Sequence, residues 1–491
     1  MQAEINMAQI IVIFGASGDL TSRKLLPALY QLDCKKRLKQ PLSIVGVSRT
    51  PMTNEQWRNK LSETTKQFIG TTFDRSRWEA FAPSIHYFSG DIDKPETFGE
   101  LDAFLKILEG DRESSRLYYL STSPTLYPVI IKQLGETGMS DPSQGPRRVI
   151  IEKPFGHDLE SARQLNQEVY DSFDEDQVFR IDHYLGKETV NNVLVLRFGN
   201  TIFEPIWNRN YIDHIQITAN EDVLVGHRAA FYEKAGILRD MFQNHLLQLL
   251  TFVTMEPPAR FDADAVRDEK VKVLRAIRAM PADEVVANTL RGQYDSYRKE
   301  PGVDLSSRTA TYAAVRLMID NWRWKDVPIY LRSGKGMSCR TTQIVVQFRQ
   351  PPHMMFDHGE TTAIFAPNRL LIQIQPVEGI QIYFQTKVPD TDMELRQTEF
   401  KFNFRDSYQG ELPEAYQRLL LDALHGDASL FARNDEVEAA WQIIDPIQRV
   451  WDEQVATAPE SYEVNSWGPL SADDWIQHWG HEWFDLCPVL Y

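Results

Sequence analysis

The chain has 491 residues, of which 42% are hydrophobic and 25% are charged, as in an ordinary globular protein of roughly two to four domains. Its net charge of −16 argues against non-specific binding to nucleic acid or to an anionic membrane. No apolar run approaches the ~20 residues that cross a bilayer, we expect no signal peptide, and three cysteines fit a reducing compartment better than a disulfide framework.

The first third of the chain alternates short apolar runs with longer amphipathic segments. Because a strand that helices cover on both faces is apolar throughout, this alternation predicts an α/β domain with a mostly parallel, doubly wound sheet. We expect a helix over 22–38 and strands over 8–14, 42–47, 85–88, 116–120, 149–152 and 177–181.

A glycine loop follows the first expected strand, and a helix-compatible stretch opens at its end, in Gly15-Ala16-Ser17-Gly18-Asp19-Leu20. Glycines permit a tight turn and a close approach of backbone to a pyrophosphate, and the helix N-terminus offers N–H groups to the anion. The loop therefore indicates a dinucleotide site. Its GxxG spacing departs from the common GxGxxG pattern, and the loop is not the GxxxxGK[ST] loop of nucleotide hydrolases.

An arginine, Arg49, follows the end of the second expected strand. An NAD-specific site usually has an acid here for the ribose 2′-hydroxyl, whereas an arginine accommodates the 2′-phosphate of NADP. Arg49, helped by Ser17 and Ser48, therefore favours NADP. The alternative is an ordinary surface residue after a strand.

The segment 180–188 combines a carboxylate, an imidazole, a phenol and an ammonium after a strand-like run. A phosphorylated sugar needs cations and hydrogen-bond donors for its phosphate, which His183, Tyr184 and Lys187 could supply. It also needs a polar group aimed at a reacting base, which Asp182 could provide. The alternative is a strand–turn–helix junction with a capping aspartate and a solvated lysine.

Beyond residue 181 the expected strands alternate apolar and polar residues, a pattern typical of strands with one buried face. Helical stretches lie between them, so we predict an α+β domain with a large, mainly antiparallel sheet. Strands are expected over 212–218, 342–348, 370–375 and 380–386, with a hairpin turn at 376–379, and helices over 237–255 and 264–280. The tail over 471–491, rich in Trp and acids, suggests no role.

The stretch Asp182-His183-Tyr184-Leu185-Gly186-Lys187-Glu188 closely resembles the signature segment of the glucose-6-phosphate dehydrogenase family. Other blocks follow the order of that family, so the resemblance covers nearly the whole chain from about residue 10 to 467–469. These blocks lie at 15–20 with 23–25, 152–156, 197–200 with 205–208, 239–240 with 243–248, and 331–335.

The resemblance implies a Rossmann-like NADP-binding domain over 1–182 and an α+β substrate-binding and oligomerisation domain over 183–491. It implies a cytoplasmic homodimer or homotetramer that oxidises D-glucose 6-phosphate at C1 and transfers a hydride to NADP, the first step of the oxidative pentose phosphate pathway. Two alternatives remain open: a dehydrogenase of another hexose phosphate, and an NADP-sensing protein without catalysis.

The resemblance also implies the catalytic pair. His245 would be the base and Asp182 the carboxylate that orients it, the two facing each other across a cleft between the halves although 63 positions separate them. Taken alone, His245 in an apolar helix would rather be a buried structural histidine.

The remaining site residues also follow from the resemblance, and we expect one or two of them to be ordinary surface charges. His183, Tyr184, Lys187 and Arg340 would contact the phosphate; Lys153 the C1 end and the nicotinamide; Glu221, Asp240 and Lys335 the sugar hydroxyls or phosphate; and Gln375 is a weaker match. Cofactor contacts would come from Gly15, Ser17, Gly18, Asp19, Leu20, Arg49 and Lys153. Pro154 could follow a cis peptide bond.

Two histidine pairs, His353 with His358 and His478 with His481, come without a convincing set of further ligands, so we predict no metal. Cys339 lies between Lys335 and Arg340, and its oxidation is a hypothetical way to disturb the substrate.

Overall fold

The computed structural model describes residues 7–353, 355, 366–391, 393–407, 413–454 and 457–487. The chain divides into two compact units. Unit 1 comprises Met1–Gly186, Ala259–Arg267 and Pro413–Glu438, and unit 2 comprises Lys187–Pro258, Asp268–Leu412 and Ala439–Tyr491. The predicted functional division of the chain at residue 182 stays a prediction.

Unit 1 is built on a six-stranded sheet in the order β3-β2-β1-β4-β5-β6, with every pair of neighbours parallel. All six predicted strands are confirmed, with ends that differ by at most two residues. They are β1 Ala8–Phe14, β2 Leu42–Ser48, β3 Ile85–Ser89, β4 Ser114–Leu120, β5 Arg147–Glu152 and β6 Val178–Ile181. The strand β1 is buried along its whole length and apolar except at Gln9, because helices cover both faces of the sheet.

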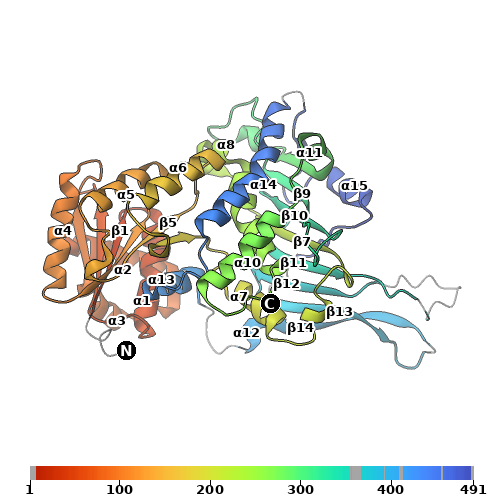
Figure 1. Ribbon diagram of the computed structural model, residues 1–491, viewed down its shortest axis with the longest axis horizontal. Helices are drawn as coiled ribbons and strands as arrows, with labels where there is room; N and C mark the ends of the chain where they lie inside the picture. The colour runs from red at the N-terminus through yellow and green to blue at the C-terminus, as the bar shows by residue number, and fades with distance from the viewer. Residues whose placement is uncertain are drawn as a thin grey trace. The chain divides into compact units, whose positions relative to one another are not determined.

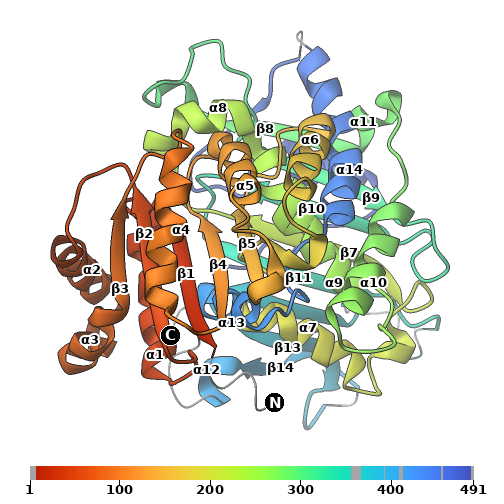
Figure 2. The ribbon, with the colours of Figure 1, turned by 60° about the vertical axis from the view of Figure 1, so that its left-hand side comes forward.

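The helices of unit 1 pack around this sheet, and Figure 2 shows α4, α5 and α6 in front of it. They are α1 Leu26–Cys34, α2 Asn54–Ile69, α3 Arg75–Phe81, α4 Glu96–Glu109, α5 Tyr127–Glu136, α6 Leu159–Tyr170 and α13 Ala415–His425. Helix α13 joins unit 1 from late in the chain, where Gln417 bonds Lys35 and Gln31.

The loop after β1 requires its first glycine. Gly15 has φ +84°, and a Cβ there would lie 2.1 Å from the carbonyl oxygen of Ser121. The chain turns helical at Asp19, passes through a π-helical stretch at Thr21–Leu25 and continues as α1. The expected helix over 22–38 therefore ends earlier, at Cys34.

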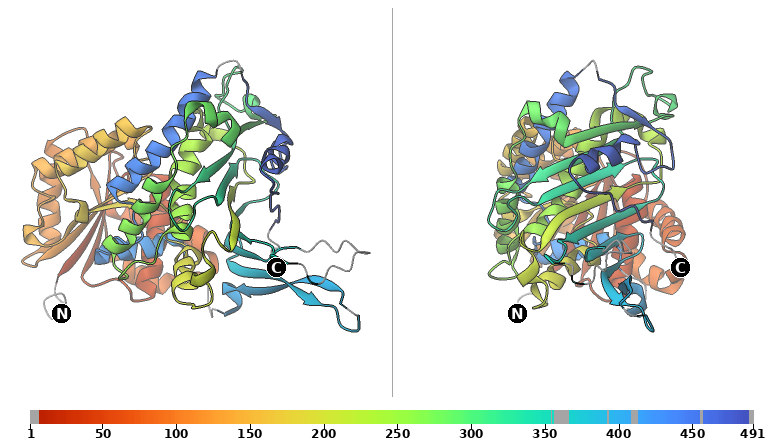
Figure 3. Two further views of the ribbon diagram at one scale, coloured as in Figure 1. Left: turned by 45° about the vertical axis from the view of Figure 1, so that its right-hand side comes forward. Right: turned by 90° about the vertical axis from the view of Figure 1, so that its right-hand side faces the viewer.

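Unit 2 is built on a nine-stranded sheet in the order β14-β13-β12-β11-β7-β10-β9-β8-β15 (Figures 1 and 3). The β7–β10 and β15–β8 pairs are parallel and the other neighbours antiparallel, which confirms a mainly antiparallel sheet. The strands are β7 Ile212–Asn220, β8 Thr289–Tyr294, β9 Tyr312–Met318, β10 Pro328–Gly334, β11 Thr341–Phe348, β12 Arg369–Gln375, β13 Gly379–Lys387, β14 Leu395–Asn403 and β15 Glu460–Tyr462. The predicted β12–β13 hairpin is present.

The helix predicted in unit 2 over 237–255 is confirmed, but its first half is π-helical. Helix α8 bends at Gly236, with φ 63°, and is followed by a π-helical segment at Leu238–Leu246, which continues as α9. The helices of unit 2 are α7 Glu188–Phe198, α8 Ala229–Ile237, α9 Leu247–Thr254, α11 Ala282–Asn288, α12 Phe404–Ser407 and α15 Ser471–His478. Two more helices, α10 Ala263–Ala276 and α14 Asn434–Glu453, begin in residues of unit 1 and end in residues of unit 2. Every residue of α9 is buried, so this helix forms the centre of the unit 2 core. Among the described residues, no helix is long and apolar enough to cross a membrane.

One disulfide joins Cys339 to Cys487, with the two Cα atoms 6.0 Å apart, and Cys34 is a free thiol. The small, odd number of cysteines did not predict this bond. The two partners are 148 positions apart in the sequence, so no spacing pattern could reveal that the fold brings them together.

Candidate active site

A carboxylate at the end of β5 is held by two phenols. Glu152 accepts hydrogen bonds from the hydroxyl groups of Tyr119 and Tyr416, the latter over 3.2 Å. Burial raises the pKa of the Glu152 carboxyl, and nearby Asp182 adds to this effect, while the two phenols and Lys153 oppose it. The Lys153–Pro154 peptide that follows is cis, as expected.

The turn after β6 carries the signature residues of unit 1. Asp182 is 2% exposed, and its Oδ1 accepts from the backbone N–H of Tyr184 over 3.0 Å. Asp182 thus does cap the turn, as the structural alternative proposed, but its Oδ2 is buried as well. Tyr184 is buried and meets the His183 ring edge-on, with the ring centroids 4.9 Å apart.

Lys187, at the N-terminus of α7, belongs to unit 2 and is half-buried. Its ammonium donates to Oε1 of Gln375 over 2.6 Å, at the end of β12. In the turn between β12 and β13, the carboxylate of Glu378 accepts from the hydroxyl of Thr189 over 2.6 Å. These bonds fix the start of α7 against the β12–β13 hairpin, and they bring the weaker match Gln375 to a predicted phosphate-binding cation.

A buried cation lies at the ends of β7 and β10 in unit 2. The ammonium of Lys335, a residue 2% exposed, pairs with the carboxylate of Glu221 and lies 2.8 Å from Oδ2 of Asp240. Burial alone would lower the pKa of Lys335, but the attraction of Asp240 and Glu221 outweighs it and the pKa is raised. The structure therefore brings together three residues that the sequence predicted for one site.

The parallel pairing of β7 with β10 produces this cluster. Gly334 lies opposite Asn220 in the register, and the N–H of Glu221 bonds the carbonyl of Gly334 over 2.9 Å. Glu221 and Lys335 are therefore the first residues beyond two adjacent strand ends, where parallel strands present their loops side by side. Arg340 lies at the other end of the same loop, and its side chain is exposed.

A phenol completes the Lys335 cluster. The ammonium lies 5.4 Å from the centre of the Tyr232 ring, a cation–π contact. Burial, with Asp240 close by, raises the pKa of the Tyr232 hydroxyl well above its ordinary value, so this phenol stays protonated. The hydroxyl of Tyr462 donates to the backbone carbonyl of Lys335 over 2.8 Å and so fixes the backbone of the Lys335 cluster.

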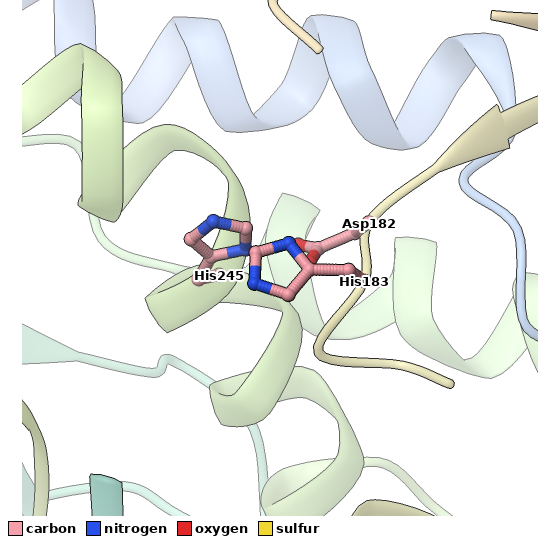
Figure 4. A group of neighbouring side chains, drawn as sticks. All are labelled: Asp182, His183 and His245. Atoms are coloured by element: carbon pink, nitrogen blue, oxygen red, sulfur yellow. The ribbon is translucent and has the colours of Figure 1, made fainter. Parts of the chain in front are cut away.

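His245 lies on the π-helical segment and is 1% exposed. The backbone N–H of His245 donates to the side-chain oxygen of Asn244 over 2.6 Å. π-helical turns inside helices occur frequently at functional sites, since they turn side chains out of the regular helical order. Figure 4 shows the imidazole of His245 leaving this segment, and the side chains of Asp182 and His183 leaving consecutive positions after β6.

The cofactor residues predicted in unit 1 gather at the ends of β1 and β2. The hydroxyls of Ser17 and Ser48 are 2.9 Å apart, and Lys60 donates to the carbonyl of Ser17 over 3.4 Å. Arg49 is exposed next to them, whereas Asp19 begins the helix and pairs with Arg23. Hydroxyls and cations without a carboxylate directly after β2 fit the 2′-phosphate of NADP.

Three aromatic residues of these sites were missed by sequence reasoning. Tyr119 and Tyr416 reach Glu152 from β4 and α13, and Tyr232 reaches Lys335 from α8. Nothing in the sequence marks Tyr416, which joins unit 1 from a segment far along the chain. Of the histidines considered for a metal, His481 bonds Tyr330 and pairs with Asp213, and His358 lies outside the described residues.

Both units match the description of one protein family. Residues 12–192 match "Glucose-6-phosphate dehydrogenase, NAD binding domain", and residues 194–484 match "Glucose-6-phosphate dehydrogenase, C-terminal domain". The chain belongs to the glucose-6-phosphate dehydrogenase family. The resemblance seen in the sequence is thereby confirmed.

Named relatives extend over nearly the whole chain. Glucose-6-phosphate 1-dehydrogenase of Aggregatibacter actinomycetemcomitans is 43% identical, covering 96% of each chain. The enzyme of Treponema pallidum is 42% identical over 96% of this chain and 94% of the relative. A solved glucose-6-phosphate dehydrogenase in complex with its substrate glucose 6-phosphate is 35% identical, with a TM-score of 0.90 over 98% of this chain and 99% of the other.

Proposed function

We propose that the chain is a glucose-6-phosphate 1-dehydrogenase, which oxidises D-glucose 6-phosphate at C1 to 6-phospho-D-glucono-1,5-lactone, the first step of the oxidative pentose phosphate pathway. The observation that carries this proposal is the match along the full length of both chains with a dehydrogenase solved with that substrate. The buried Lys335 cluster adds the polar groups that a sugar requires.

The proton of the C1 hydroxyl would go to His245. Asp182 would accept a hydrogen bond from the far ring nitrogen of His245, which would hold the accepting nitrogen towards the hydroxyl and stabilise the imidazolium that forms. The burial of both side chains supports this proposal, because a dry site strengthens the attraction between a carboxylate and an imidazolium.

The sugar would be held at two ends. Lys187, with His183 and Tyr184, would bind the phosphate, and Arg340 would add a second cation there. Glu221 and Asp240 would accept hydrogen bonds from ring hydroxyls, because the ammonium of Lys335 holds both carboxylates in place beside it. The three charged groups hold one another in place before substrate arrives, so little ordering remains for binding.

NADP supplies the hydride acceptor when it is bound. Its pyrophosphate would lie at the loop of Gly15, Ser17, Gly18, Asp19 and Leu20, and Arg49 would contact its 2′-phosphate. Lys153, next to the Glu152 carboxylate, would lie between the nicotinamide and C1 of the sugar. A cytoplasmic location and a homodimer or homotetramer are further parts of this proposal.

The test is NADPH formation followed by absorbance with several hexose 6-phosphates, each with NADP and with NAD. We expect glucose 6-phosphate with NADP to have the highest kcat/KM, by about tenfold or more over its epimers. A higher value for another sugar would make the chain a dehydrogenase of that hexose phosphate. NADP binding without turnover of any sugar would favour the NADP-sensing protein.

A further inference from the structure

A cavity of about 230 Å³ lies within unit 2, and we call it the Arg308 cavity. Its walls come from the end of α8, the start of the π-helical segment, β8, the loop before β9 and the last turns of α14. None of the site residues predicted from the sequence lines it. The volume suits a small metabolite and is too small for a nucleotide or a drug-sized ligand.

Two arginines bring positive charge to this cavity. Arg308 is exposed, and among the described residues no carboxylate forms an ion pair with it. Arg291 is half-buried, and its guanidinium donates to the carbonyls of Trp451 over 2.6 Å and Thr457 over 2.7 Å. Burial lowers the pKa of Arg291 and the charge of Arg308 lowers it further, while Asp452 opposes both effects. The two guanidinium groups therefore repel each other, and a bound anion would relieve that repulsion.

The two acids that line the cavity are engaged by other donors. The carboxylate of Glu233 accepts hydrogen bonds from the hydroxyls of Tyr297 over 2.6 Å and Ser307 over 2.8 Å. Asp452 is exposed and accepts from the amide of Gln448 in the same helix over 2.8 Å. In the described part of the chain, neither acid forms an ion pair with the two arginines of the cavity. Their charge thus remains for a ligand.

The backbone adds hydrogen-bond donors at the same place. Gly236, with φ 63° and ψ 176°, breaks the helical backbone at the end of α8, and the N–H of Ile237 bonds the carbonyl of Ala310 over 3.1 Å. A new helical run starts at Leu238 and continues through α9. The first N–H groups of a helix lack partners within the helix and attract anions. Because Gly236 and Leu238 line the cavity, this helix start faces the same space as the arginines.

We propose that the Arg308 cavity binds the phosphate group of a small molecule and thereby fixes the start of the helical run that carries Asp240 and His245. Guanidinium groups and the N–H groups of a helix start are the donors that phosphates bind in proteins. Two guanidinium groups match a doubly charged anion with several oxygens better than a carboxylate. The volume restricts the ligand to orthophosphate or the monophosphate ester of a short polyol.

The helical run connects the cavity to the proposed active site. Asp240 lies in its first turn and pairs with Lys335, and His245 lies further along the same π-helical segment. A ligand that holds the first N–H groups in place should therefore reduce local opening of this turn. The consequence for the sugar rests on the proposed function, whereas the binding of phosphate does not.

The binding test is thermal unfolding of the full chain in rising orthophosphate or glycerol 3-phosphate, with chloride keeping the ionic strength constant. The dissociation constant follows from the rise in Tm. The comparison is made in Lys187→Ala, which weakens the proposed phosphate site of the sugar. Arg308→Gln is added to this background, and Arg449→Gln, an exposed arginine of α14 outside the cavity, is the matched control.

We expect Arg308→Gln to weaken binding of the tighter anion about tenfold or more, and Arg449→Gln to leave it unchanged. Tighter binding of the ester would identify a phosphorylated metabolite as the ligand, and tighter binding of orthophosphate would identify free phosphate. Equal dissociation constants with and without Arg308 would overturn the site, as would no rise in Tm with either anion.

Amide hydrogen exchange tests the effect on the helical run. Saturating phosphate should slow exchange over 237–241 about threefold or more in the wild type, and Arg308→Gln should abolish this slowing. Slowing that persists without Arg308 would contradict the proposal. NADPH formation by the same proteins tests the proposed function separately. Phosphate binding that depends on Arg308, in a chain that does not turn over glucose 6-phosphate, would keep the cavity site and remove only the function.

Discussion

Burial does not separate a structural histidine from the proposed catalytic base, as His214 and His245 show. Both are buried. His214 donates from Nδ1 to Asp213, and its Nε2 accepts from the amide of Gln216. Both ring nitrogens therefore bond side chains of the same strand, β7. His245 instead lies on the π-helical segment that also carries Asp240, a member of the Lys335 cluster. The resemblance of the block around His245 to the family, more than burial, therefore supports its proposed role as the base.

Replacement of His245 by asparagine should reduce kcat by about 10²–10⁴-fold, the contribution of a positioned base, with KM for glucose 6-phosphate nearly unchanged. Steady-state kinetics measure both values. His478→Asn is the control, because His478 is exposed at the end of α15. Turnover like that of the control would remove His245 from the mechanism.

Replacement of Lys187 by alanine should raise KM for the phosphorylated sugar by about tenfold or more, because a charge-assisted hydrogen bond to the phosphate is lost. We expect kcat to change less. Lys272→Ala removes an ammonium that only pairs with Glu269 on a helix surface and should leave both constants unchanged. An unaltered KM in Lys187→Ala contradicts its assignment to the phosphate.

Site residues could be predicted where they lie in a sequence block that resembles the family. They could not be predicted where only tertiary packing brings them to the site. Asp240 and Lys335 lie in two recognisable blocks, and they meet in the structure. Tyr416 lies in no such block, and its contact with Glu152 depends on α13 packing into unit 1. Contacts of this kind follow from tertiary packing, which local patterns do not contain.

At the scale of elements, the β1–helix connection rests on the shape of one loop. Gly15→Ala would place a methyl group 2.1 Å from the Ser121 carbonyl and force the backbone to move. A displacement of about 1 Å in a binding loop can cost about 10²-fold in rate. Because the displaced loop is the proposed pyrophosphate site, we expect a large rise in KM for NADP together with a lower Tm.

The control for that variant is Gly110→Ala at the end of α4. Gly110 also has a positive φ, 61°, but a Cβ there would meet nothing within 4 Å. It should lose only about 1–3 kcal/mol of unfolding free energy, the cost of a sparsely populated backbone conformation, and keep the wild-type KM. Equal KM values for NADP in the two variants would exclude a role for the Gly15 turn in the cofactor site.

The almost continuously apolar β1 and the partly alternating β12 were predicted from the sequence. The mostly apolar β9 and the irregular β8 and β10 were not. β10 begins with Pro328 and carries Arg332 inside, and β8 contains a glycine, so neither has the pattern of a strand. Both form because neighbouring strands of unit 2 provide the hydrogen-bonding partners.

At the scale of the whole molecule, the sequence predicted the fold class but not what covers the large sheet. The alternation in β7 indicated one buried and one exposed face, yet Gln216 is buried. The C-terminal segment, residues 481–487, packs on it from more than 260 positions away. A tail of mixed Trp and acidic residues therefore covers a polar sheet face, a role that its composition did not suggest.

This covered face should make stability depend on pH. Burial lowers the pKa of His214, although Asp213 opposes the effect. As pH falls below about 6.5, the unfolded chain therefore takes up a proton that the folded protein does not, and stability declines by at most about 1.4 kcal/mol per pH unit for this group. His214→Asn lacks this group, so its Tm should fall less than that of the wild type between pH 7.5 and 5.5.

Thermal unfolding at the two pH values measures the difference, and His478→Asn again provides the control. Because His478 is exposed, its replacement should leave the pH dependence as in the wild type. A Tm that falls equally in all three proteins would show that His214 does not set the acid sensitivity of the fold.

The parallel β7–β10 pair makes the geometry of the Lys335 cluster independent of the length of the intervening chain. Glu221 and Lys335 leave neighbouring strands at one edge, and their mutual position depends on the register of those strands alone. Residues inserted at the exposed positions 301–302, which lie between the two strands in the sequence, should leave both charges in place. This point is accordingly a suitable place to graft a tag or a reporter loop while keeping the Lys335 cluster intact.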